Sequence, residues 1–295
     1  DNDSKEHEII NINPLPDIQI PSDDEVISEL AEPYHLTNDQ VNFFKKNGFI
    51  KLKKVFSPGA VLKLRAELIN LLKKEFKVDP DKEAYDRFLS LEMIWPDNAL
   101  LRAYVLSPRL GQISANLLEV SAVRLYHDNV LAKQSGCGRT PWHFDDHHFP
   151  LDTNDVVTAW APAQPTPIEM GPLSFAYPLD VHELIKDVTF EKTGTGYDRE
   201  VSNIFSKNNV NVNATPFELG EVSFHHNLNF HTASSNRTNC SRIALANTYY
   251  RDGARVINSP TMVSGDWQKF MPNVKPGDVA ASPLNPICWP VKSEI

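Results

Sequence analysis

The feature that most constrains the fold is a change of pattern near residue 122. From there on, apolar residues gather in short runs of strand length, separated by turn residues and prolines. These runs cover residues 122–133, 156–161, 173–176, 221–224 and 243–250. Many short strands after a helical first part predict a mainly β fold of the α+β class, in which an antiparallel sandwich or barrel packs against helices.

The first part of the chain carries helix start signals. Thr37 and Gln40 have the spacing of a capping box, in which each side chain bonds the backbone N–H of the other residue. Ser57 stands directly before Pro58, a pair typical of a helix start, and the same pair recurs at 107–108. We therefore expect helices at about 38–47, 58–76 and 108–118, with a short strand at 49–55.

The domain organisation follows from length and patterning. At roughly 150 residues per domain, 295 residues would suit two domains, although β barrels often form one larger domain. Residues 1–33 are acidic, rich in proline and without sustained periodicity, so they are expected to form an arm along the surface. Residues 34–295 are expected to form a single domain. The poorly patterned insertion at 177–215 is typical of a lid or binding loop and, with the N-terminal segment, is expected to supply most of the pocket walls.

Composition narrows the class of protein. Hydrophobic residues make up 41% and charged residues 23%, which fits a globular protein and excludes global disorder. The net charge of −9 argues against a nucleic-acid partner, because the phosphates would be repelled. No apolar run approaches the roughly 20 residues of a membrane span and no secretory pattern opens the sequence, so a cytoplasmic protein is expected. The three cysteines are widely spaced and are expected to be free thiols.

Chemistry concentrates in two histidine-rich segments, WHFDDHHFP at 142–150 and FHHNLNFH at 224–231. In the first, His143 and Asp145 are two residues apart, so that on a strand both side chains would point to the same face. A buried carboxylate is costly unless it is paired or bound to a metal. One histidine from a distant strand would complete a set of two histidines and one carboxylate, which holds Fe(II) on one face and leaves the other positions open.

Three histidines are candidates for the third position: His225, His226 and His231. Eleven residues after the last of them, Arg242 opens the strand-like run RIALANTYY. An arginine can donate two parallel hydrogen bonds to a carboxylate. A ligand histidine and this arginine on neighbouring strands would suit a dicarboxylate cosubstrate, one end at the metal and the other at the guanidinium.

These segments, in this order and at this spacing, resemble the phytanoyl-CoA dioxygenase family of Fe(II)- and 2-oxoglutarate-dependent oxygenases, from about Leu36 to Pro286. The segment LTNDQVNFFKKNGFIKLKKVFSP is similar to the family's opening helix and strand. TPWHFDDHHFPLDTNDVVTAW resembles its HxD block, EMGPLSFA the block after it, and GEVSFHHNLNFHTASSNRTNCSRIAL the distal block. The resemblance implies a double-stranded β-helix core (jelly-roll, cupin-like) with N-terminal helices.

Position by position, the resemblance implies His143, Asp145 and His231 as iron ligands and Arg242 as the residue that binds the distal carboxylate of 2-oxoglutarate. Related halogenases replace the carboxylate ligand with a small residue, whereas Asp145 is present here. The implied reaction is therefore hydroxylation of an unactivated C–H bond in a small molecule, or a related oxidation, with Fe(II), 2-oxoglutarate and O₂ as cofactors and succinate and CO₂ as products.

Four further positions follow from the resemblance with less support. Trp160 matches an aromatic residue of the cosubstrate pocket, although it also suits an ordinary core position. Lys133 falls where relatives place a polar residue on the pocket wall, and Asn236 matches an asparagine of the distal block. Many members have Gly-Ser-His after the EMGPLSF-type block, whereas this chain reads AYPLDVHE, so that only His182 stands near that histidine.

Candidates for substrate contact are four residues that also suit a purely structural role: His127, Asp146, His147 and His148. By parity along its strand, His127 faces the same side as Lys133. His225 and His226 alternate in direction, so at most one of them faces the cavity, and a core or supporting role is favoured for both.

One alternative class remains, a cupin-like metal-binding protein or zinc hydrolase without oxygenase activity. Two histidines and an aspartate also hold zinc, which binds such sites more tightly than Fe(II). Arg242 argues against a hydrolase, because hydrolysis needs no residue for a dicarboxylate.

Overall fold

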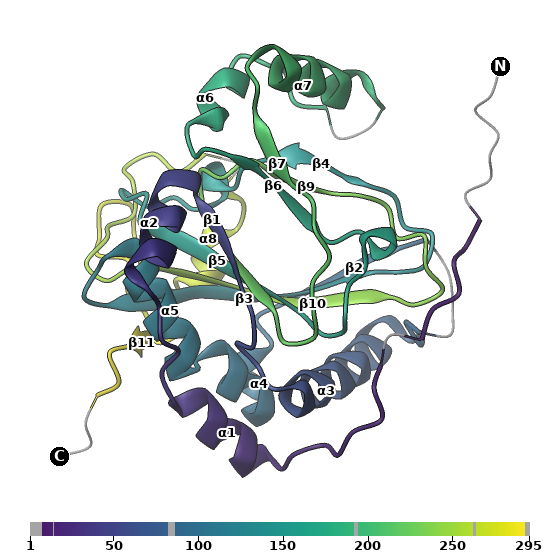
Figure 1. Ribbon diagram of the computed structural model, residues 1–295. Helices are drawn as coiled ribbons and strands as arrows, with labels where there is room; N and C mark the ends of the chain where they lie inside the picture. The colour runs from purple at the N-terminus through teal and green to yellow at the C-terminus, as the bar shows by residue number, and fades with distance from the viewer. Residues whose placement is uncertain (1–7, 14, 82–85, 192–193, 262–263, 293–295) are drawn as a thin grey trace.

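Two antiparallel β-sheets that face each other form the centre of the fold (Figure 1). The computed structural model describes all residues except 1–7, 14, 82–85, 192–193, 262–263 and 293–295. The larger sheet has the order β1 (Phe49–Leu52), β8 (Val222–His226), β5 (Val156–Pro162), β10 (Arg242–Arg251), β3 (Val123–Lys133) and β11 (Ile287–Trp289), and β2 (Phe88–Glu92) also pairs with β3. The smaller sheet has the order β4 (Thr140–His143), β9 (His231–Ala233), β6 (Leu173–Tyr177) and β7 (Asn211–Asn213). The predicted α+β class with a jelly-roll core is confirmed.

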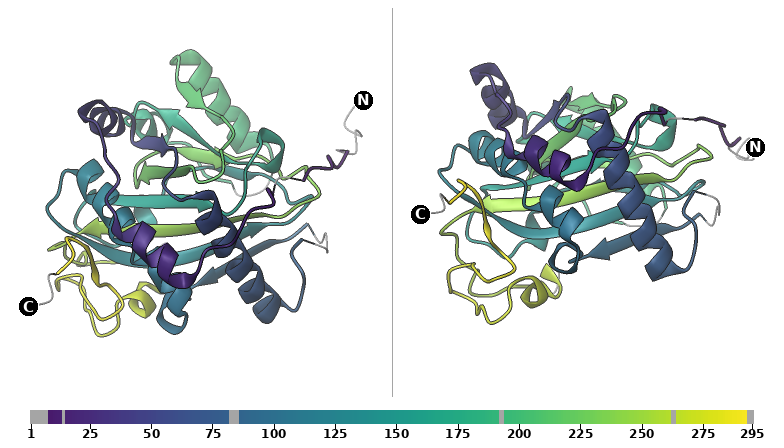
Figure 2. Two further views of the ribbon diagram at one scale, coloured as in Figure 1. Left: turned by 60° about the horizontal axis from the view of Figure 1, so that its bottom comes forward. Right: turned by 90° about the horizontal axis from the view of Figure 1, so that it is seen from below.

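The N-terminal helices cover the outer face of the larger sheet, and α3 crosses its strands (Figure 2). They are α1 (Asp23–Ala31), α2 (Asn38–Asn47), α3 (Pro58–Phe76), α4 (Ala99–Val105) and α5 (Pro108–Leu118). The predicted capping box of α2 is present, because the Thr37 hydroxyl accepts from the Gln40 N–H and the Gln40 amide oxygen accepts from the Thr37 N–H. The three helices expected at 38–47, 58–76 and 108–118 are confirmed within these bounds.

Alternation along β10 separates the helix-facing core from the space between the sheets. Ile243 and Leu245 belong to the buried cluster under the helices, whereas Ala244 and Ala246 belong to the cluster between the sheets. The inward side chains are small, so they leave room between the sheets. This room positions the cavity described below.

Two segments contain secondary structure that the sequence analysis did not predict. The expected arm at 1–33, of which residues 1–7 and 14 lie outside the described part, contains the helix α1, whose Ser22–Glu25 capping box and buried Val26 and Leu30 were missed. The poorly patterned insertion at 177–215 contains α6 (Val181–Ile185), α7 (Gly196–Lys207) and β7. The helix α7 buries apolar residues at a spacing of four and packs on the outer face of the smaller sheet. These patterns were short and diluted by polar residues, so periodicity alone did not show them.

The last described helix, α8 (Trp267–Phe270), follows β10 and was also not predicted. It packs with Tyr126 and Phe149 at one end of the sheets, apart from the N-terminal helices. In the described part of the chain, no helix is both long and apolar enough to cross a membrane. The cysteines Cys137, Cys240 and Cys288 are free, as expected.

Candidate metal and cosubstrate site

Two histidines meet on neighbouring strands of the smaller sheet. His143 is the last residue of β4 and His231 is the first residue of β9, and the two are register partners in this antiparallel pair. Their ring centroids are 4.3 Å apart. Of the three histidines that were candidates for the third metal ligand, His231 is therefore the one that pairs with His143.

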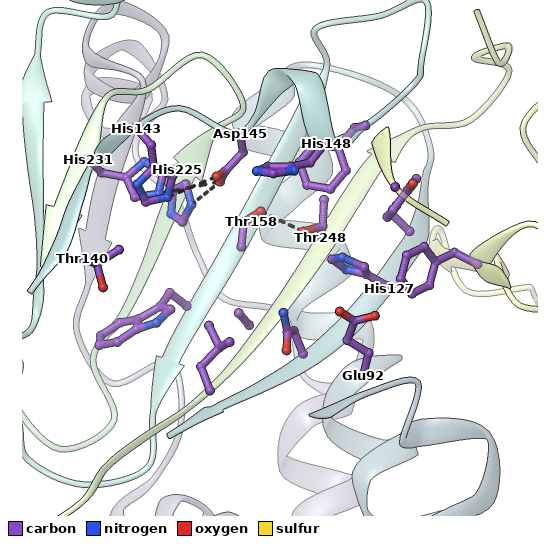
Figure 3. Close-up of a pocket in the computed structure, with 18 of the residues that line it drawn as sticks. Glu92, His127, Thr140, His143, Asp145, His148, Thr158, His225, His231 and Thr248 are labelled. Atoms are coloured by element: carbon purple, nitrogen blue, oxygen red, sulfur yellow. Dashed lines mark hydrogen bonds and ion pairs between the residues drawn. The ribbon is translucent and has the colours of Figure 1, made fainter. Parts of the chain in front are cut away.

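Asp145 joins this pair from outside the strand (Figure 3). Its Oδ1 lies 3.5 Å from Nε2 of His143 and its Oδ2 lies 3.7 Å from Nε2 of His231. The side chains of His143 and Asp145 converge as predicted, but they do not do so by alternation along one strand. β4 ends at His143, and Asp145 has a helical φ and ψ of −101° and −7° before the 3₁₀ turn η2 (Asp146–His148). Strand alternation therefore does not place the carboxylate.

The two imidazoles are oriented by backbone carbonyls. Nδ1 of His143 lies 2.8 Å from the Pro141 carbonyl oxygen, and Nδ1 of His231 lies 3.0 Å from that of Asn229. A carbonyl only accepts, so both Nδ1 atoms carry the proton and both Nε2 lone pairs are free. One ligand atom from each of these histidines and from Asp145 lie within 4.8 Å of one another. This pattern of oriented histidines is typical of a metal site.

The electrostatics suit a divalent cation. Burial lowers the pKa of His231 well below its ordinary value, so its imidazole is neutral near pH 7. Burial would raise the pKa of Asp145, but the surrounding histidines, with the hydrogen bond from His225 among them, hold that pKa below the ordinary range. A neutral imidazole and an ionised carboxylate are the forms that bind metal. The residues present therefore fit Fe(II).

Two buried cations lie across the space between the sheets. Arg242 and Lys133 are register partners on β10 and β3, so their side chains share the inward face. Arg242 is 2% exposed and Lys133 is 1% exposed. Among the described residues, neither forms an ion pair with a carboxylate. Burying a charge without a counter-charge is costly, so this pair indicates a place for an anion.

The existing contacts of the two cations are polar but uncharged. One Nη of Arg242 donates to the Gly171 carbonyl at 2.7 Å, while its Nε has no hydrogen-bond partner among the described residues. Gly171 has a φ of +78°, and a Cβ there would overlap the carbonyl of Ser234, so glycine is required at this approach. Nζ of Lys133 donates to the Thr140 hydroxyl at 3.2 Å and to the Ser234 carbonyl at 3.1 Å.

Burial lowers the pKa of both Lys133 and Arg242. It lowers the pKa of Lys133 to about 7, with the Arg242 charge acting in the same direction. It also lowers the pKa of Arg242 to about 10. The guanidinium lies 5.2 Å from the centre of the Trp160 ring, which forms part of the wall. A bound carboxylate would relieve the cost of both charges.

A cavity of about 480 Å³ connects the metal group with the arginine and extends to α8. This volume lies in the range of about 300–1,000 Å³ of small-molecule sites. The predicted residues His127, His148 and Trp160 line it, whereas Lys133, Asp146, His147 and His182 do not belong to its lining. No described residue of the insertion at 177–215 lines it either. The expectation that the N-terminal segment and the insertion form the walls is therefore wrong.

The wall comes instead from β2, from the inward faces of both sheets and from 264–270 around α8. Sequence reasoning missed this last segment, because it lies far along the chain from the metal residues and carries no motif. Asn236, the distal-block asparagine, does not enter the cavity. Its amide donates to the carbonyls of Lys133 and Cys240 and so supports the loop between β9 and β10.

Of the two adjacent histidines on β8, only one faces the site. Nε2 of His225 lies 3.2 Å from Oδ2 of Asp145, and its ring centroid lies 4.3 Å from that of His231. His226 points away and accepts from the Leu228 N–H at 3.1 Å, and burial lowers its pKa to about 4. This agrees with the expectation that at most one faces the cavity.

A jelly roll that holds two histidines and one aspartate at one end of a cavity and a buried arginine at the other has the architecture of an Fe(II)- and 2-oxoglutarate-dependent dioxygenase. Residues 44–244 match the phytanoyl-CoA dioxygenase (PhyH) family, and the chain belongs to this family. A curated relative, the peroxisomal phytanoyl-CoA dioxygenase of Mus musculus, is 24% identical over 231 residues, which are 72% of this chain and 67% of that protein. The chain is accordingly a non-haem Fe(II)/2-oxoglutarate-dependent dioxygenase.

Solved structures share the fold. The alpha-ketoglutarate-dependent carbocyclase SnoK from nogalamycin biosynthesis superposes with a TM-score of 0.69 at 23% identity, over 87% of this chain and 99% of that one. The epimerase SnoN, in complex with Fe³⁺, alpha-ketoglutarate and nogalamycin RO, superposes with a TM-score of 0.65 at 19% identity, over 85% of this chain and 97% of that one.

Proposed function

We propose that this protein hydroxylates an unactivated C–H bond of a small molecule, with succinate and CO₂ as the coproducts. His143, Asp145 and His231 are the iron ligands in this proposal, and Arg242 holds the distal carboxylate of 2-oxoglutarate. Lys133, its register partner, adds positive charge beside it from outside the cavity lining. When bound, iron would activate O₂, which is the oxidant, and 2-oxoglutarate would be the reductant that is converted to succinate and CO₂.

The observation that carries this proposal is the placement of the buried Arg242 guanidinium, without a counter-charge among the described residues, in the cavity of the metal group. Arg242 lines the cavity that the three metal residues also line. Its second Nη and its unpartnered Nε suit a carboxylate held by parallel hydrogen bonds. A zinc hydrolase would have no use for a buried guanidinium without a counter-charge, so this arrangement favours the oxygenase over that alternative.

The protein's own contribution is orientation and exclusion of water. The carbonyls of Pro141 and Asn229 fix the imidazole rings, and the Trp160 ring covers one side of the guanidinium. Leu173, Ala233 and Ala246 give the cavity an apolar part of its wall. Apolar walls exclude water and so strengthen charge interactions inside a cavity.

The substrate would occupy the part of the cavity between the metal group and α8. We retain His127 and His148 as candidates for substrate contact, because both line the cavity. Glu92 and Lys269, which form an ion pair at 3.0 Å, line it as well. Asp146 and His147 drop out as direct contacts, since they lie outside the lining. SnoN binds nogalamycin RO in its complex. The volume here supports a small molecule as the substrate class, and the absence of a nucleic-acid partner stays a prediction from the net charge.

The cytoplasmic location also stays a prediction. Its support is the free state of all three cysteines, because free thiols persist in reducing compartments.

The test is anaerobic titration of the protein with Fe(II) and then 2-oxoglutarate. We expect one equivalent of each to bind, with a visible charge-transfer band on addition of 2-oxoglutarate, and succinate to form once O₂ is admitted. Zn(II) in place of Fe(II) serves as the control and should give neither the band nor succinate. Binding of Fe(II) without any response to 2-oxoglutarate would contradict the proposal and favour a simple metal-binding protein.

A further inference from the structure

Asp145 depends on the larger sheet for its position. Because β4 ends at His143, strand pairing in the smaller sheet does not fix the backbone at Asp145. Two contacts across the gap fix the residue: its backbone N–H donates to the Asn227 carbonyl at 3.0 Å, and its Oδ2 accepts from Nε2 of His225 at 3.2 Å. Both partners belong to β8 or follow it directly.

His225 reaches this carboxylate from the opposite sheet. On β8 it is the register partner of Phe49 on β1 and of Thr158 on β5, so its side chain points inward. Its ring packs against Phe175 of the smaller sheet, with the centroids 5.8 Å apart. Figure 3 shows it beneath Asp145, next to the pair of ligand histidines. The side chain therefore bridges the two sheets at the metal group.

The hydrogen bond fixes the tautomer of His225. An ionised carboxylate only accepts, so Nε2 of His225 carries the proton and is not available as a metal ligand. Its Nδ1 is buried and has no hydrogen-bond partner among the described residues. Such an unpaired atom costs stability, and an apolar ring would pack against Phe175 without that cost. Packing alone thus does not account for a histidine at this position.

We propose, building on the function above, that His225 is a positioning residue for the iron ligand Asp145. By holding Oδ2, it leaves Oδ1 as the oxygen available to the metal and prevents rotation of the carboxylate. If β4 were two residues longer, strand alternation would position the Asp145 side chain. Because β4 ends before Asp145, the contact with His225 positions it instead. Loss of such a partner of a metal ligand typically weakens metal binding by about 10–100-fold.

The experiment compares four proteins: wild type, His225→Phe, His225→Gln and His226→Asn. Co(II) is the probe, and its visible absorption reports both the dissociation constant and the geometry at the metal. We expect His225→Phe to weaken Co(II) binding about 10–100-fold and to change the spectrum. His225→Gln should recover most of the affinity, because its amide can donate to Oδ2. His226→Asn, on the outward side of the same strand, retains an acceptor for the Leu228 N–H and should match wild type.

A second measurement does not depend on any variant folding. Pulsed EPR of the Mn(II)-loaded wild type counts the coordinated imidazole nitrogens, and two support the proposal. Three would make His225 a ligand and overturn it.

The results for the variants can also overturn the proposal. Wild-type affinity and spectrum in His225→Phe would overturn the proposal, and so would a His225→Gln variant as weak as His225→Phe, because the hydrogen bond would then not be the cause. Thermal unfolding of the metal-free proteins separates a loss of fold from a loss of binding. If wild type bound no Co(II), the iron site and this proposal would fall together. If wild type bound metal and formed succinate while all variants equalled it, only the positioning role would fall.

Discussion

Replacing Arg242 with methionine should separate stability from cosubstrate binding. Burial lowers the pKa of Arg242 from 12.5 to about 10. At 1.36 kcal/mol for each pKa unit, the charged form is destabilised by about 3 kcal/mol relative to water. Removing the residue loses the hydrogen bond to Gly171 and the contact with the Trp160 ring, which together offset about 2 kcal/mol. The cosubstrate-free variant should therefore be more stable than wild type by about 1 kcal/mol.

The same change should severely weaken 2-oxoglutarate binding. Truncating one partner of a buried, hydrogen-bonded charge pair costs about 2–5 kcal/mol, which corresponds to a dissociation constant roughly 30- to 5,000-fold higher. Calorimetric titration of 2-oxoglutarate into the metal-loaded protein measures this loss. Urea unfolding of the metal-free and cosubstrate-free protein measures the gain in stability.

Arg65→Met is the matched control. Arg65 is equally buried, but it donates to Asp81 at 2.6 Å and to Gln164 at 2.5 Å, so its removal leaves polar groups without a partner. That variant should lose stability while binding 2-oxoglutarate normally. A clear loss of stability in Arg242→Met, or an unchanged affinity for 2-oxoglutarate, would refute the reasoning that Arg242 is kept for its ligand.

Two further predictions concern the other charges. Because burial and the Arg242 charge lower the pKa of Lys133 to about 7, its ammonium form is present below that pH and is lost as the pH rises through it. The affinity of wild type for 2-oxoglutarate should thus decrease as the pH rises above 7, and calorimetry on Lys133→Met should show no such decrease. Asp145→Ala should weaken Co(II) binding by more than about 100-fold and abolish succinate formation. Asp146→Ala should retain both, because Asp146 accepts from Asn227 outside the cavity lining; a metal affinity in Asp145→Ala equal to that of Asp146→Ala would remove Asp145 from the ligand set.

The predictable part of the fold rests on short-range signals. The helix that begins after Thr37 followed from two side chains three residues apart, and the one that begins at Pro58 from a serine and a proline in sequence. The long strands β3 and β10 were predicted because apolar residues recur along the whole length of each. Short elements such as β4 and β9, which carry the metal histidines, were not found, since three or four residues show no period.

The sequence predicted which residues form the candidate site better than it predicted how they are arranged. The HxD block and the distance from His231 to Arg242 pointed to the residues that the structure brings together. The cross-strand pairing of Arg242 with Lys133 was beyond reach, because register depends on which strands become neighbours. The wall around α8 was beyond reach for the same reason, since it forms only when the segment after β10 folds back over the end of the sheets.

The site is divided between the two sheets, and each sheet carries one kind of charged or metal-binding group. The smaller sheet carries the ligand histidines on β4 and β9, whereas the larger sheet carries the buried cations on β3 and β10. In the proposed complex, a dicarboxylate that reaches from metal to guanidinium would bind both sheets at once. Without it, Asp145 keeps two polar links to the larger sheet near the metal, one with His225 and one with the Asn227 carbonyl. Because ligands that bind only the folded state stabilise it by mass action, the cations that destabilise the empty protein become attachment points once the cosubstrate is bound. The destabilisation by Arg242 and Lys133 is thus confined to the state without cosubstrate, which explains how two uncompensated charges persist in a core this tightly packed.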